Sequence, residues 1–65
     1  MTTKWIPASR LTTRRQLVEP GPRKREVRKI CEIVQNGQTV QLRVRVGDAI
    51  ESRTFHPKQR ACVVA

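Results

Sequence analysis

The stretch Val40-Gln-Leu-Arg-Val-Arg-Val46, preceded by Asn36-Gly37, decides the fold class. Apolar and polar residues alternate strictly along it, which is the pattern of an antiparallel strand with one buried face. Asn-Gly is the strongest short signal for a hairpin, because both residues tolerate the positive φ of a type I′ turn. The sequence therefore predicts a β-hairpin around this turn.

A two-residue turn at Asn36-Gly37 also fixes which residues lie opposite each other. Ile33 then faces Val40, and Cys31 faces Leu42. The buried face of the hairpin is predicted to hold Val27, Cys31, Ile33, Val40, Leu42, Val44 and Val46. The opposite face is predicted to hold Arg28, Ile30, Glu32, Val34, Gln41, Arg43 and Arg45.

The next turn lies at Gly47-Asp48-Ala49. A two-residue turn would place Glu51 and Arg53 on the apolar face. A three-residue loop instead keeps Ile50 inward and sets Glu51 opposite Arg45, so we expect the three-residue loop.

A third strand is then expected at residues 50–55, ending before Pro57, which cannot donate to a strand ladder. Residues 61–65 suit a short fourth strand. The predicted fold class is mainly β, with a small antiparallel sheet of three to four strands. Such a sheet needs cover on its apolar face. The available covering residues are Trp5, Ile6, Leu11, Leu17, Val63 and Val64.

Charge divides the chain unevenly. Residues 1–29 carry nine cations and two acids, a net +7, whereas the remaining residues carry a net +2. Pro20-Gly21-Pro22 forbids a continuous helix. We therefore predict a basic N-terminal arm over residues 1–26 and an antiparallel β domain over residues 27–65. The arm holds either a short helix over residues 10–18 or no regular structure.

Length and composition exclude several classes of protein. The chain has 65 residues, with 14 Lys and Arg, 5 Asp and Glu, and a formal net charge of +9. A chain this small buries only about 60% of its unfolded surface, which argues against two domains and most enzymes. No segment has the roughly 18 apolar residues of a membrane span, and the start lacks the apolar region of a signal peptide. Two cysteines are too few for a disulfide scaffold, which predicts a cytoplasmic protein.

The basic composition favours nucleic acid as the partner, DNA or RNA, because Lys and Arg neutralise phosphates and release counterions. Phe55 flanked by guanidinium groups would suit stacking of unpaired bases. The alternative is that Phe55 packs under the C-terminal segment. The candidate nucleic-acid-binding residues are Arg14, Arg15, Arg23, Lys24, Arg25, Arg28, Arg43, Arg45, Arg53 and Phe55.

Catalysis, metal and cofactor find little support in the residues. Cys31, His56 and Cys62 lack a C-x-x-C pair and a second histidine, so we expect no metal site. A buried free Cys31 and a surface His56 are the simpler interpretation, although a disulfide between the two cysteines stays open. There is no paired carboxylate and no Gly-rich phosphate loop. We therefore expect no cofactor and no enzymatic activity.

Residues 30–60 resemble the opening of a WYL-type domain. The resemblance rests on an apolar strand, Asn36-Gly37, Val40-x-Leu42-x-Val44, Gly47 and Arg53-Thr-Phe-His-Pro57. The residues that name that family are absent from these positions. The resemblance implies an SH3-like or Sm-like β-barrel, here a partial one, of a kind common in bacterial transcription regulators. No functional residue is carried over from it.

Together these features predict a small, non-catalytic nucleic-acid-binding module, such as a phage, plasmid or bacterial accessory regulator. One alternative is an inhibitor or adaptor that binds an acidic surface of a host protein, where positive charge would steer association. Another is a component of a virion or ribosome that becomes ordered on assembly. No membrane partner is expected. The chain is expected to be a monomer or a homodimer paired through sheet edges.

Overall fold

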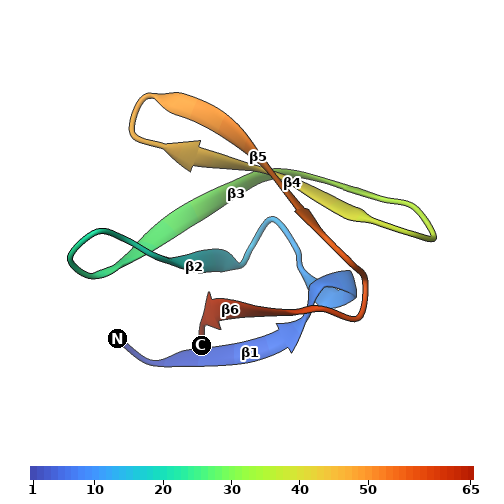
Figure 1. Cartoon of the computed structure of the whole chain (residues 1–65), viewed down its shortest axis with the longest axis horizontal. Coiled ribbons are helices and arrows are strands. Elements are labelled where there is room, and N and C mark those ends of the chain that lie inside the picture. Colours follow the sequence, from blue (N-terminus) through green and yellow to red (C-terminus); the bar gives the residue numbers. More distant parts are fainter.

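The computed structural model describes residues 1–65 as an antiparallel sheet of six strands with one short 3-10 turn (Figure 1). The strand order is β1-β6-β2-β3-β4-β5, so β1 and β5 form the two edges. The elements are β1 (Thr3–Pro7), η1 (Ala8–Arg10), β2 (Gln16–Pro20), β3 (Arg25–Gln35), β4 (Val40–Val46), β5 (Ala49–Phe55) and β6 (Arg60–Val64). The mainly β fold class is confirmed, but three to four strands is too few.

The strand β3 is shared by two halves of the sheet. Its first part pairs with β2 and its second part with β4, and the register shifts between Ile30 and Glu32, which marks a β-bulge. In Figure 1, β3 lies between β4 and β5 above and β2 below, with β1 and β6 at the bottom. The sheet therefore curves around a core that both halves share.

The bulge changes which β3 residues point inward. Ile30 is buried and Ile33 packs against the core, whereas Cys31 and Val27 are exposed. The prediction that Cys31 and Val27 are buried, with Ile30 on the other face, is therefore wrong. One extra residue at a bulge shifts the inward positions by one, which an alternating pattern alone does not reveal.

The β3–β4 turn differs from the predicted type I′ turn. Gln35 lies opposite Val40, two residues away from the expected register. The Asn36 Oδ1 atom accepts hydrogen bonds from the backbone N–H groups of Gln38 and Thr39, both at 2.8 Å, so Asn36 begins the turn. A shift of two residues leaves every side chain on its expected face. Three β4 residues are fully buried as predicted: Val40, Leu42 and Val44.

The β4–β5 turn is one residue shorter than predicted. Val46 pairs with Ala49 across Gly47-Asp48, and Gly47 has a φ of +60°. Positive φ at the first central position is what a two-residue type II′ turn requires. The expected three-residue loop is therefore wrong. Because a one-residue difference reverses every side chain of the strand, Glu51 and Arg53 lie on the inner face of the sheet.

The N-terminal residues belong to the same sheet as the rest of the chain. β1 pairs with β6, and β2 pairs with β3 along its whole length. The predicted basic arm over residues 1–26, separate from a β domain over residues 27–65, is therefore wrong, as is the helix over residues 10–18. Without β1 and β2, the backbone N–H and C=O groups at the edges of β3 and β6 would be unpaired.

The segment Pro20-Gly21-Pro22 opens the β2–β3 turn and does not act as a linker. The backbone N–H of Gly21 donates to the Lys24 carbonyl at 2.9 Å. A Cβ at Gly21 would lie 2.4 Å from that same carbonyl oxygen, so only glycine fits. This turn brings three consecutive cations, Arg23, Lys24 and Arg25, to one end of the sheet.

The core is small and lies inside the curved sheet. Of the predicted covering residues, Leu11, Leu17 and Val63 are buried and Ile6 packs against the core, but Trp5 is 60% exposed. The buried cluster comprises Ala8, Leu11, Leu17, Ile30, Val40, Leu42, Val44, Ala61 and Val63. No helix in the structure is long and apolar enough to cross a membrane.

Candidate nucleic-acid interface

A chain of ion pairs runs along the inner side of the sheet. Glu19 Oε2 accepts a hydrogen bond from Arg53 Nε at 2.7 Å, and Glu19 Oε1 accepts one from Arg28 Nε at 3.3 Å. Arg28 also pairs with Glu26, and Arg53 donates to Glu51 at 3.0 Å. Three carboxylates and two guanidinium groups thus form one network with a single excess negative charge. We call these five residues the inner charge cluster.

Glu19 is the centre of the inner charge cluster. Its hydrogen bond from Arg53, aided by Arg28, holds the pKa of the Glu19 carboxyl below its ordinary value of 4.5 against the opposing effect of burial. The same contact with Glu19, and a second with Glu51, raises the pKa of Arg53 further. Both groups therefore stay charged at neutral pH.

The inner charge cluster divides the predicted binding residues. Arg28 and Arg53 are held by carboxylates, whereas Arg43 and Arg45 are exposed on the outer side of β4. Sequence reasoning placed all four on one face, which the register of β5 and the bulge in β3 contradict. Phe55 is half-buried, lies opposite Val40 and packs against the core, as the alternative interpretation expected.

The outer side of β1, β6, β2 and β3 presents a different set of residues. Paired residues share a face, so Trp5 shares its face with Cys62, and Pro20 with Arg25. Leu17 and Val63 pair on the inner side, which puts their chain neighbours outside. We call this surface the Trp5 face. It comprises Thr3, Trp5, Pro7, Gln16, Val18, Pro20, Arg25, Val27, Lys29, Arg60, Cys62 and Val64, of which Val18 and Cys62 are buried.

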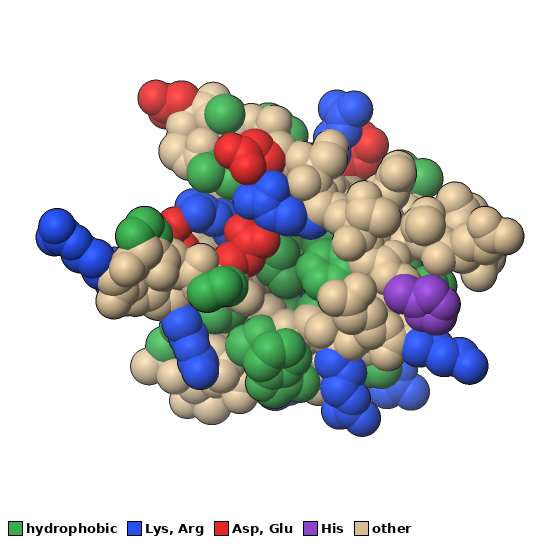
Figure 2. All heavy atoms as spheres, in the orientation of Figure 1, with side chains coloured by type: hydrophobic (Ala, Val, Ile, Leu, Met, Phe, Trp, Pro, Cys, Tyr) green, Lys and Arg blue, Asp and Glu red, His purple; other side chains and the backbone are tan.

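The Trp5 face carries cations and no carboxylate. Arg25, Lys29 and Arg60 are exposed and form no ion pair, whereas Glu19 and Glu26 point to the inner side. Glu32 lies further along β3, beyond the bulge, on the outer side opposite Arg43 and outside the Trp5 face. In Figure 2 the acidic side chains gather in the upper half of the view, whereas Lys and Arg side chains project from both halves. The strand register therefore leaves the cations of the Trp5 face without a carboxylate partner.

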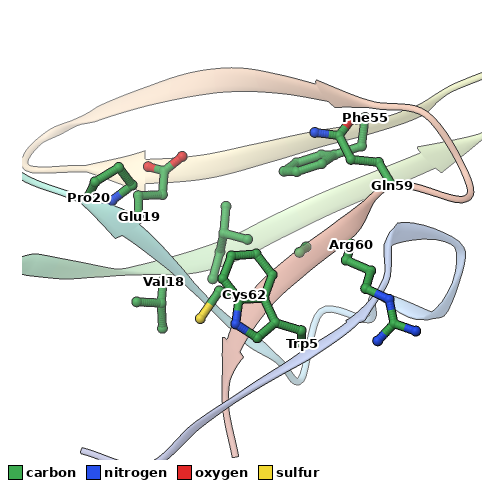
Figure 3. Close-up of a pocket in the computed structure, with 10 residues that line it drawn as sticks. Trp5, Val18, Glu19, Pro20, Phe55, Gln59, Arg60 and Cys62 are labelled. Atoms are coloured by element: carbon green, nitrogen blue, oxygen red, sulfur yellow. The ribbon is translucent and has the colours of Figure 1, made fainter.

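A groove of about 270 Å³ opens beside Trp5. Strands β2 and β6 pair only at Leu17 and Val63 and then diverge, so the space between them is not closed by a ladder. Figure 3 shows the Trp5 ring beside Cys62, with Val18 on one side and Arg60 on the other. Arg25 reaches the same region, because its Nη1 atom lies 3.4 Å from Thr3 Oγ1 on β1.

The other predicted cations lie at separate places. Arg23 and Lys24 are exposed at the β2–β3 turn, next to the Trp5 face. Arg14 is exposed and Arg15 half-buried in the turn before β2, where Arg15 N–H donates to the Thr12 carbonyl at 3.1 Å. The structure therefore brings together only part of the predicted site.

Sequence reasoning missed Trp5, Lys29 and Arg60 as surface residues of one face. The segment Thr3-Lys-Trp-Ile-Pro7 forms β1, and its pairing with β6 places Trp5 next to the C-terminal strand. That alignment depends on pairing between the two ends of the chain. A local pattern cannot supply it.

No group of three or more His, Cys, Asp or Glu side chains lies close enough to hold a metal ion. Cys31 is an exposed free thiol and Cys62 a buried one, so the two form no disulfide. Cys31 was expected to be the buried cysteine, but the buried cysteine is Cys62.

Comparisons of the chain with protein-family models, with curated protein sequences and with solved structures give no match. Function is therefore inferred from the charge distribution and geometry of the sheet.

Proposed function

We propose that the protein binds nucleic acid without catalysis, through the Trp5 face and the adjoining β2–β3 turn. The observation that carries this proposal is the difference in charge between the inner side of the sheet and the Trp5 face. On the inner side, Arg28 and Arg53 form ion pairs with three of the five acids. On the Trp5 face, cations stand without carboxylates.

Electrostatics supports nucleic acid as the ligand. Arg28 and Arg53 are the only Lys or Arg residues in ion pairs, so twelve of the 14 lack a carboxylate partner. Repulsion among them raises the free energy of the unbound protein, and a polyanion relieves it. Each phosphate contact releases counterions, which makes affinity fall steeply with salt.

For the fold, we propose that the curved sheet is a partial SH3-like or Sm-like barrel. A long bulged β3 shared by both halves, and the pairing of the two chain ends through β1 and β6, support this topology. A WYL-like origin of residues 30–60 fits the same topology, since they span the second half of β3, β4 and β5. A small accessory regulator is the biological context that we propose.

The test is a binding titration with labelled duplex DNA, single-stranded DNA and RNA at about 150 mM salt. We expect binding to at least one of them, with affinity that falls as salt rises. Replacing Arg25, Lys29 and Arg60 together by Gln should weaken binding and lower the salt slope by about 2–3 units, close to one per lost contact. The absence of binding to all three ligands would refute the proposal.

A matched control removes the same number of charges from other surfaces. Arg10, Arg43 and Arg45 are exposed and lie outside the Trp5 face, so their triple Gln variant has the same net charge. We expect it to bind more tightly than the Trp5-face variant. Equal loss in both variants would mean that net charge alone drives binding and that the proposed surface is wrong. Selective binding of an acidic protein would instead favour the inhibitor or adaptor alternative.

A further inference from the structure

The largest apolar side chain of the protein lies outside its core. Trp5 is 60% exposed, although the chain has only two aromatic residues and a small buried cluster to fill. Trp5 sits on the edge strand β1, opposite Cys62, so its position follows from the register of the sheet. Burying it would stabilise the fold, and its exposure therefore leaves an aromatic surface available to a ligand.

The space next to this ring suits a small flat group. The groove between β2 and β6 has a volume of about 270 Å³, and Val18 and Cys62 form apolar walls beside Trp5. Pockets for drug-sized ligands measure roughly 300–1,000 Å³, so this groove fits a ligand fragment better than a whole compound. A single heterocyclic base has the required shape and an apolar face.

The charges around the groove suit the backbone of such a ligand. Arg60 lines this groove, and Arg25 lines a second groove of about 230 Å³ that shares Trp5, Val18 and Cys62 with the first; neither arginine forms an ion pair. The one carboxylate in its lining, Glu19, is already held by Arg28 and Arg53. A phosphate on either side of a stacked base would thus meet a cation and no free acid.

We propose that Trp5 stacks one unpaired base of a single-stranded nucleic acid, with flanking phosphates against Arg25 and Arg60. This inference rests on the proposed nucleic-acid binding and specifies the ligand of the same surface. The bases of a duplex are already stacked on their neighbours and do not offer a free ring face. Trp5 therefore distinguishes single strands from duplexes, a role that sequence reasoning assigned to Phe55.

The test uses Trp5 as its own probe, because it is the only tryptophan of the chain. Oligothymidine, oligouridine and a short duplex DNA are titrated into the full-length protein while tryptophan emission and affinity are measured. We expect quenching by single strands and little change with the duplex. The oligothymidine and oligouridine arms show whether DNA or RNA is preferred. Equal quenching by duplex and single strands, or none by single strands, would overturn the inference.

Variants separate stacking from charge. Trp5→Leu should lose roughly 5- to 150-fold in affinity for single strands, with the duplex affinity and the salt slope unchanged. Trp5→Phe keeps an aromatic face and should retain most of the affinity. The matched control is Val34→Ala, which alters an exposed apolar residue on the other half of the sheet and should bind like the parent. Melting curves confirm that each variant is folded.

The outcomes distinguish this inference from the proposed function. If Trp5→Leu binds single strands as tightly as the parent, charge alone holds the ligand, so the inference fails and the proposed function stands. If no nucleic acid binds, both fail. A change in Trp5 emission with protein concentration in the absence of ligand would show that a second copy of the chain covers the ring, which also overturns the inference.

Discussion

The inner charge cluster and the Trp5 face use the same residue types in opposite ways. On the inner side, Arg28 and Arg53 each lie against two carboxylates. On the outer side, Arg25 and Arg60 are exposed without an acid nearby in the register. The comparison shows that net charge does not identify a binding surface, because strand register decides which cations remain free.

A physical reason links the two regions. The inner side borders the apolar core, where an unpaired charge would be costly to desolvate, so arginines there need partners. The outer side faces water, where unpaired cations are tolerated because they stay hydrated. The inner charge cluster thus stabilises the sheet and holds Glu19, Glu26 and Glu51 against cations on the inner side.

The largest effect is expected from the core between these two regions. Leu42 is fully buried, so Leu42→Ala should cost about 2–5 kcal/mol of unfolding free energy. A domain of this size has only about 3–5 kcal/mol in total, so the variant should be largely unfolded. Thermal and denaturant melts followed by circular dichroism measure this. An unchanged midpoint for Leu42→Ala, or an equal loss for the exposed Val34→Ala, would contradict the assigned inner face.

A second test breaks the inner charge cluster. Arg53→Gln removes the strongest partner of Glu19 and leaves a half-buried carboxylate with Arg28 alone. We expect a loss of about 1–2 kcal/mol, below the cost of a fully buried pair because these side chains keep some contact with water. The matched control is Arg43→Gln on the outer side of the neighbouring strand, which should leave the melting temperature nearly unchanged. A larger loss for Arg43→Gln would reverse the contrast drawn between the two sides.

Acid weakens the same contact by protonating Glu19. The pKa of Glu19 is lower in the folded chain than its ordinary value of 4.5, so its contribution to stability is complete above that value. The contribution is lost as pH falls through the folded pKa, while Arg53 stays protonated throughout. Melting temperatures from about pH 7 down to about pH 3 should therefore fall at the acid end. Glu19→Gln should flatten this acid limb, and an equally steep limb in that variant would count against the role of Glu19.

The smallest effect concerns the turn that sets the register of Arg53. Gly47 has a φ of +60°, so Gly47→Ala should cost about 1 kcal/mol. Gly37 lacks a positive φ and has open space at its Cβ position, so Gly37→Ala should be neutral or slightly stabilising. Parallel denaturant melts of the two variants provide the comparison. A larger loss for Gly37→Ala than for Gly47→Ala would show that the Asn36-Gly37 turn is the one that requires glycine.

The sequence predicted the parts of the fold that depend on short-range alternation. The burial of alternate residues in β4 was correct even though the β3–β4 register is off by two, because an even shift preserves the faces. The strands at residues 50–55 and 61–65 were also predicted close to their observed bounds. The sequence predicted that the candidate site consists of Lys and Arg residues. It did not predict which of them share a face of the sheet.

The errors in grouping have two local causes. The bulge at Cys31 and the two-residue turn at Gly47-Asp48 each shift a strand by one residue. Either shift exchanges the faces of all residues beyond it. Arg28 and Arg53 therefore moved inward, and Phe55 moved with Arg53.

The sequence by itself determined that this chain forms a mainly β structure with an excess of cations, because alternation and composition act locally or additively. Only the tertiary structure decided where those cations stand and which aromatic side chain is exposed. Glu19 lies 34 residues from Arg53 along the chain, and its carboxylate pairs with the Arg53 guanidinium that the register of β5 places on the inner side. Trp5 is exposed because β1 pairs with the far end of the chain at the edge of the sheet. Contacts between such distant residues form only when the sheet closes around its core, and no local pattern specifies them.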